Sequence, residues 1–101
     1  GAWADEVART ASVQPLGLTP KRRTMVQLRL ARTGLRSLPL VIAADGSFYF
    51  KGEGDRSIWL SPHDENDCAP CDAAPEELDV AIAIDRFQQV VDWPVDAVER
   101  R

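Results

Sequence analysis

The spacing between hydrophobic residues changes along the chain, and each change predicts a different element. Within residues 1–14 the apolar side chains stand three and four positions apart, at Trp3, Val7, Ala8 and Ala11. Asp5 and Glu6 lie near the start, where the dipole of a helix favours negative charge. This pattern predicts a short amphipathic helix that ends before Pro15.

From residue 23 onward, apolar side chains alternate with polar ones, as they do in strands with one buried face. The first such strand is expected at residues 23–30, with its core face formed by Val26, Leu28 and Leu30. Another is expected at residues 57–61, where Trp59 lies between two aliphatic residues and therefore points away from the core. These strands predict one antiparallel sheet.

A β-hairpin is predicted around Asp45-Gly46, the dipeptide preferred in tight hairpin turns, because it separates an apolar run from a second extended arm. Successive side chains of a strand point to opposite faces, so the two phenylalanines of that arm would share the core side. Tyr49 and Lys51 are then expected on the opposite surface of the sheet.

The clearest helix is predicted from Pro75 onward, because proline is tolerated in the first turn of a helix. Its apolar stripe consists of Val80, Ile84, Phe87 and Val91. Asp92-Trp93-Pro94 ends the helix, and residues 95–101 resume an extended pattern. The predicted fold class is therefore α+β, with a central antiparallel sheet and two flanking helices.

Composition narrows the choice of function. A chain of 101 residues with 45% hydrophobic and 28% charged residues is an ordinary small globular domain rather than a disordered chain. Its net charge of −4 and its scattered cations argue against nucleic acid, since binding phosphates needs a concentrated basic surface. It contains neither a membrane-spanning apolar run nor a signal peptide, so a soluble, cytoplasmic protein is expected.

The segment "HDENDCAPCD", residues 63–72, holds the only histidine and both cysteines. Cys68 and Cys71 have the Cys-x-x-Cys spacing of redox sites, but the acidic residues around them would raise a thiol pKa rather than lower it. Zinc would find three ligands in His63 and the two thiols, without the second Cys/His pair that usually completes such a site. A surface loop with two reduced thiols is the favoured interpretation, so no metal site is predicted.

Several segments resemble the D-amino-acid oxidase and glycine oxidase family of FAD-dependent oxidoreductases. "GAWAD" at the start is similar to the small-residue turn that leads from a flavin-domain strand into a helix, and "LGLTPKRRTMVQL" to the passage into the substrate domain. "GSFYFKGEGDRSIWLSPHDE" resembles the adjoining sheet strands. The tail from "CDAAPEELDVA" onward resembles the helix and return strand of one bacterial subgroup. The resemblance spans essentially the whole chain, and the order and spacing of these segments carry it.

The resemblance implies a parent protein that oxidises an amine or an amino acid, of the D-amino-acid or glycine type, to an imine with FAD as cofactor. Residues 1–20 would be a helix and a connection leaving the FAD domain, and residues 21–101 the substrate-binding sheet and its long helix. No Gly-x-Gly-x-x-Gly turn is present to hold the FAD pyrophosphate. The chain is therefore expected to be a fragment that neither binds FAD nor turns over substrate alone.

The resemblance also implies site residues. Tyr49 and Lys51 would bind the small-molecule substrate, because a tyrosine can donate a hydrogen bond to a carboxylate and a lysine can supply the counter-charge. Gly1, Ala2 and Trp3 would approach FAD through backbone groups, since small residues permit close contact. The competing interpretation is a non-catalytic α+β module that binds a partner or another copy of itself as a homodimer.

Overall fold

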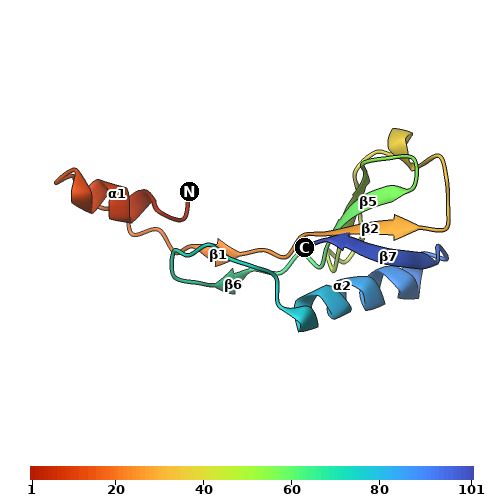
Figure 1. Cartoon of the computed structure of the whole chain (residues 1–101). Helices are drawn as coiled ribbons and strands as arrows, with labels where there is room; N and C mark the ends of the chain where they lie inside the picture. Colours follow the sequence, from red (N-terminus) through yellow and green to blue (C-terminus); the bar gives the residue numbers. More distant parts are fainter. The chain divides into compact units, whose positions relative to one another are not determined.

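The computed structural model describes residues 1–101, and these residues form two compact units. The first unit consists of Gly1–Arg22 and Glu65–Ala73, and the second consists of Arg23–Asp64 and Ala74–Arg101. Helices and antiparallel sheets are both present, which confirms the predicted α+β fold class (Figure 1). The first unit includes residues 65–73 as well as the segment predicted to precede the sheet. None of the helices is long and apolar enough to traverse a lipid bilayer.

The first unit contains helix α1, Ala4–Thr10, and a short antiparallel ladder of β1, Lys21–Arg22, with β6, Asn66–Asp67. The short amphipathic helix was predicted, and the structure shows that its apolar face is not buried. None of its residues is buried, and the side chains of Trp3 and Val7 are 54% and 65% exposed. The reason is that α1 has no hydrophobic cluster of its own unit to pack against.

The side chain of Asp5 holds the segment that follows α1. Its Oδ1 atom accepts a hydrogen bond from the backbone N–H of Leu16 at 3.0 Å, and its Oδ2 atom accepts those of Gly17 and Leu18, each at 2.9 Å. Partial desolvation acts to raise the pKa of Asp5, but these three donors outweigh it and hold the pKa below the ordinary value of 3.8. One carboxylate thus holds residues 16–18 in place beside the helix.

This contact predicts a pH dependence. A carboxyl group whose pKa is lowered by folding stabilises the folded state above its unfolded pKa, and this contribution is lost as pH falls through the folded pKa. We therefore expect the amide proton shifts of residues 16–18 to titrate together in NMR spectra, with a midpoint below pH 3.8. Asp5→Asn should abolish this common titration. A midpoint at or above the ordinary value in the unmodified chain would contradict the contact.

The second unit is built on a five-stranded antiparallel sheet with the order β3-β4-β5-β2-β7. Its strands are β2 (Val26–Leu30), β3 (Val41–Ile42), β4 (Tyr49–Gly52), β5 (Ser57–Ser61) and β7 (Val95–Arg100). β3 and β4 form the predicted hairpin. Gly46 occupies its turn with a φ of +73°, a left-handed conformation that glycine adopts without steric cost. The strands predicted by alternation are therefore confirmed.

Helix α2, Glu77–Val90, covers one face of this sheet. The buried side chains that face it come from every strand except the edges and from the 3-10 helix η1, Leu35–Ser37; with those of α2 they are Val26, Leu28, Leu30, Leu35, Phe48, Phe50, Ile58, Leu60, Val80, Ala83 and Phe87. Arg86 of α2 donates from Nη1 to the carbonyls of Ser47 and Pro62, at 2.9 and 2.8 Å. These bonds fix the helix to one end of the sheet.

Two predicted details of α2 are corrected by the structure. Pro75 lies outside the helix rather than in its first turn, because Glu76 is extended (φ −78°, ψ 146°) and the helix begins at Glu77. The helix is buried along Val80, Ala83 and Phe87, whereas the predicted Ile84 is only half-buried. The stripe is thus rotated slightly from the one that hydrophobic spacing alone indicated.

Candidate functional site

The face of the sheet opposite α2 carries the residues that the sequence singled out. Phe48 and Phe50 are buried in the core, while Tyr49 is half-buried and Lys51 is exposed, as predicted from alternation. Strand pairing places Lys51 opposite Trp59, and Trp59 opposite Gln27 of β2. Paired residues of neighbouring strands project to the same side. We call this surface, formed by Gln27, Arg29, Tyr49, Lys51 and Trp59, the open face.

Tyr49 is held by side chains from two other segments, Met25 and His63. Its hydroxyl donates to Sδ of Met25 at 3.4 Å, and its ring meets the ring of His63 edge-on, with centroids 5.4 Å apart. The imidazole Nδ1 of His63 lies 2.9 Å from the carbonyl oxygen of Gly46, and the backbone N–H of His63 donates to Ser61 Oγ. The Tyr49 ring is therefore fixed in orientation, while its hydroxyl donates only to a thioether, which is a weak acceptor.

His63 itself has a φ of +58°, in the left-handed region that non-glycine residues seldom adopt. The segment after it is anchored by Asp64, which accepts both the backbone N–H and the hydroxyl of Thr24 at 2.8 Å. Thr24 is fully buried, so these bonds satisfy polar groups that water cannot reach. The strained backbone at His63 is in this way held against Tyr49.

The two cations of the open face differ in their surroundings. Arg29 pairs with Glu99 of β7 at 3.4 Å, and Glu99 also accepts a hydrogen bond from Ser57 Oγ at 3.0 Å. Lys51, by contrast, makes no ion pair within the chain. Arg29 is therefore already engaged by a carboxylate, and Lys51 is the cation of this face that has no ion-pair partner.

Gly1, Ala2 and Trp3 belong to the first unit, where they form the turn that begins α1. The backbone N–H of Ala4 donates to the carbonyl of Gly1 at 3.0 Å, and Trp3 is the N-cap residue without a side-chain cap. Next to them lies a hollow of about 290 Å³, lined by Gly1, Ala2, Leu18, Thr19, Pro20 and Lys21. FAD would need a phosphate-binding turn as well as such a hollow, and the sequence of these residues holds no Gly-x-Gly-x-x-Gly turn.

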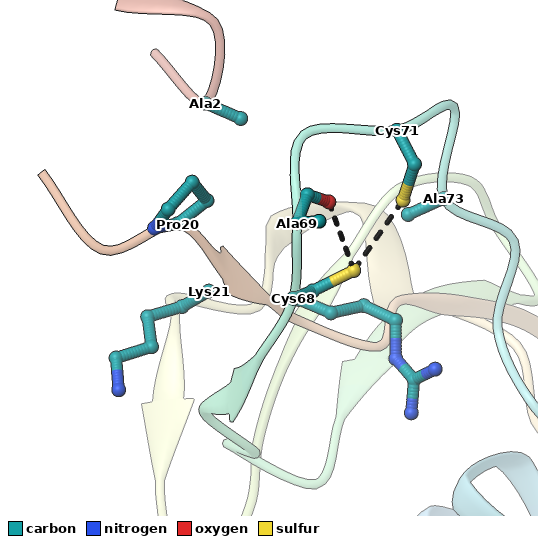
Figure 2. Close-up of a pocket in the computed structure, with 8 residues that line it drawn as sticks. Ala2, Pro20, Lys21, Cys68, Ala69, Cys71 and Ala73 are labelled. Atoms are coloured by element: carbon teal, nitrogen blue, oxygen red, sulfur yellow. Dashed lines mark hydrogen bonds between the residues drawn. The ribbon is translucent and has the colours of Figure 1, made fainter. Parts of the chain in front are cut away.

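The cysteines form a second candidate site within the first unit (Figure 2). Cys68 Sγ lies 3.3 Å from Cys71 Sγ and 3.2 Å from the carbonyl oxygen of Ala69, and both cysteines are free thiols. The hydrogen bond with Cys68 raises the pKa of Cys71 above its ordinary value, and the charge of Asp72 adds to this, against an opposing effect of Arg22. Asp72 thus acts in the predicted direction, but the contact with Cys68 and partial desolvation are the larger causes. No three His, Cys, Asp or Glu side chains converge in a way that could hold a metal ion.

Sequence reasoning placed Tyr49 and Lys51 on the open face but missed their surroundings. Met25 and His63 surround Tyr49, although they lie 24 and 14 positions from it along the chain. The register of β4 against β5, which pairs Tyr49 with Ser61, brings His63 to this place. No local signal in the sequence fixes that register, so these contacts required the folded chain.

Comparison with known proteins adds no family assignment. No model of a known protein family matches the chain. The second unit has an antiparallel sheet with a helix on one face and aromatic and cationic side chains on the other. The resemblance to amino-acid oxidases therefore stays a prediction that rests on the segments quoted above.

Proposed function

We propose that this chain is the substrate-binding part of an FAD-dependent amine or amino-acid oxidoreductase. One observation carries the proposal beyond the resemblance: Tyr49 and Lys51 share the face of the sheet that α2 leaves uncovered. A substrate wall needs side chains that are held in position and yet reach outward. The fixed ring of Tyr49 and the uncommitted charge of Lys51 meet both needs.

The chemistry of the two groups favours a substrate with a carboxylate. The Tyr49 hydroxyl would exchange a weak hydrogen bond to Met25 for a charge-assisted one to a carboxylate oxygen, which is stronger. Lys51 would supply the positive charge without first breaking an ion pair. Trp59, opposite Lys51, offers apolar surface to the rest of the substrate. An amino acid has such a carboxylate and a further side chain, so this substrate class agrees with the resemblance.

The sequence holds no Gly-x-Gly-x-x-Gly turn for the FAD pyrophosphate, so we assign the cofactor to another part of the parent protein. We propose that Gly1, Ala2 and Trp3 contact that part of the parent protein. Their approach to FAD through backbone groups stays a prediction. We expect the isolated chain to bind no FAD, and we place the parent enzyme in the cytoplasm.

The test uses the complete reading frame that encodes these residues. Its purified product should show a flavin absorption band that bleaches on anaerobic addition of glycine or one of a set of D-amino acids. Lys51→Met and Tyr49→Phe should each raise the KM of that substrate by about tenfold to a hundredfold, since a hydrogen bond to a charged group contributes about 1.5–3 kcal/mol. Bound flavin content should remain unchanged in both variants.

Arg36→Gln is the matched control, because Arg36 is an exposed cation of the same unit on η1 rather than on the open face. Its KM should stay within about twofold of the unmodified protein. A product without flavin would refute the enzyme class. A flavin that bleaches while KM is unaffected by both open-face variants would refute the assigned roles and leave the class intact.

A non-catalytic binding or oligomerisation module is the second candidate, and exposed apolar side chains favour it. Leu16 and Val13 of the first unit are 82% and 61% exposed, and Ile42 on the edge strand β3 is 56% exposed. Exposed apolar side chains that gather into one patch are often covered by a partner, and a homodimer is the assembly that the sequence predicted. A flavin-free product of the complete reading frame that sediments as a stable dimer would support this candidate over the enzyme.

A further inference from the structure

The cysteine pair is the chemically reactive group that the proposed function does not use. The two Sγ atoms lie 3.3 Å apart, and a disulfide bond is about 2.05 Å long. Closing the bond therefore requires the sulfur atoms to approach by about 1.3 Å, a movement within reach of side-chain rotation.

The surroundings keep the pair together and accessible. The backbone N–H of Cys68 donates to the carbonyl of Pro20 at 3.1 Å, directly beside the ladder that pairs Lys21 with Asp67. Cys68 is half-buried on this support, whereas Cys71 is exposed. Both thiols line a small pocket of about 40 Å³ together with Ala2, Pro20, Lys21, Arg22, Ala69 and Ala73 (Figure 2). A reagent in solution thus meets Cys71 first, with Cys68 fixed behind it.

We propose that Cys68 and Cys71 form a vicinal dithiol site that reacts with small-molecule disulfides and closes to an intrachain disulfide. The inference is independent of the proposed function, because it rests on the first unit alone. It also differs from a thioredoxin-like centre. A thioredoxin-like centre has a thiol activated by a helix N-terminus, whereas no helix begins at Cys68 and the contact with Cys68 raises the pKa of Cys71.

The reaction balances in two exchange steps. The Cys71 thiol loses its proton and its sulfur attacks one sulfur of the small-molecule disulfide, whose S–S bond breaks to release one thiolate. The Cys68 sulfur, also deprotonated, then attacks the Cys71 sulfur of the mixed disulfide and releases the second thiolate. The two protons pass to the two released thiolates. The cysteine pair is oxidised by two electrons, and the small-molecule disulfide is reduced to two thiols.

Closure of the disulfide is compatible with the ladder of β1 and β6. The bond would tie Cys71 to Cys68, whose backbone is bonded to Pro20 next to β1. The loop of residues 68–71 would then lose freedom in the unfolded chain as well as in the folded one. Oxidation is therefore expected to leave the ladder intact rather than to open it.

The test equilibrates the 101-residue chain with reduced and oxidised glutathione, then traps free thiols by alkylation and measures intact mass. The unmodified chain should lose two hydrogens and retain no glutathione. Cys68→Ser and Cys71→Ser should each retain one glutathione, because no second thiol remains to displace it. The equilibrium constant for closure should be at least about tenfold larger in the folded chain than in the same chain in urea, since folding holds the thiols close together.

A second probe tests directly whether the two thiols of the unmodified chain lie close together. Phenylarsine oxide, which binds two neighbouring thiols at once, should bind the unmodified chain with one-to-one stoichiometry and neither serine variant. Circular dichroism would establish that both variants keep the helix content of the unmodified chain. Glutathione retained on both cysteines, or equal closure constants in buffer and in urea, would overturn the proposal.

Discussion

Phe87→Ala should lower the free energy of unfolding by about 3–5 kcal/mol, the largest loss expected from any truncation in this chain. Phe87 is fully buried, and its ring meets those of Phe50, Phe48 and Trp93 edge-on at centroid distances of 5.3, 6.3 and 6.3 Å. Alanine would remove a side chain that joins α2 to both the hairpin and the segment before β7. A small domain is stable by about 5–15 kcal/mol in total, so this loss is a large share.

Urea unfolding followed by tryptophan fluorescence would measure this loss, because Trp93 lies against Phe87. Leu78→Ala is the matched control: it stands in the same helix but is 67% exposed, so its effect should remain within about 0.5 kcal/mol. Should Phe87→Ala be too unstable to give a folded baseline, Phe87→Leu would provide a smaller loss that can be measured. A loss below about 1 kcal/mol for Phe87→Ala would contradict the packing described here.

Gly52→Ala is expected to destabilise the fold by about 1–3 kcal/mol or more through crowding rather than through a cavity. A Cβ atom on Gly52 would lie 1.9 Å from the carbonyl oxygen of Leu35 and 2.9 Å from its carbonyl carbon. Leu35 cannot easily withdraw, because its side chain is buried and its backbone N–H donates to Asp55 at 3.0 Å. Strand β4 would therefore have to move away from η1.

Gly54→Ala provides the control for Gly52→Ala, since its Cβ atom would meet nothing nearer than Ser57 Cβ at 3.7 Å, an ordinary contact. Its effect on the unfolding free energy should be below about 1 kcal/mol. Because Gly52 directly follows Lys51, displacement of β4 should also raise the substrate KM of the parent enzyme under the proposed function. Equal stability of the two alanine variants in urea unfolding would show that η1 does not approach β4 this closely.

The hairpin and the strands of the sheet could be predicted because their signals are local. Alternation identified β2 and β5, and Asp45-Gly46 marked the turn that the left-handed φ of Gly46 requires. The ladder of β1 with β6 was not predicted. It joins two pairs of polar residues more than 40 positions apart, and no apolar pattern distinguishes such short segments from loops.

The candidate site likewise combines features that the sequence predicts with features that depend on the fold. That Tyr49 and Lys51 share a face followed from the two-residue period of a strand. That Lys51 is the uncommitted cation and Arg29 the paired one depends on β7 pairing with β2, which brings Glu99 beside Arg29. The short distance between the two Sγ atoms could not be predicted from their spacing either, because a Cys-x-x-Cys segment adopts many conformations.

The order of residues along this chain was sufficient for its α+β class, for most of its elements and for the side of the sheet on which Tyr49 stands. These properties depend on the periods of side chains within single segments. The strand order, the contact of His63 with Tyr49 and the lack of a core beneath α1 emerged only in the folded molecule. Backbone hydrogen bonds between strands are the same for every residue type, so packing of the whole core selects the register and with it the neighbours of each candidate site residue.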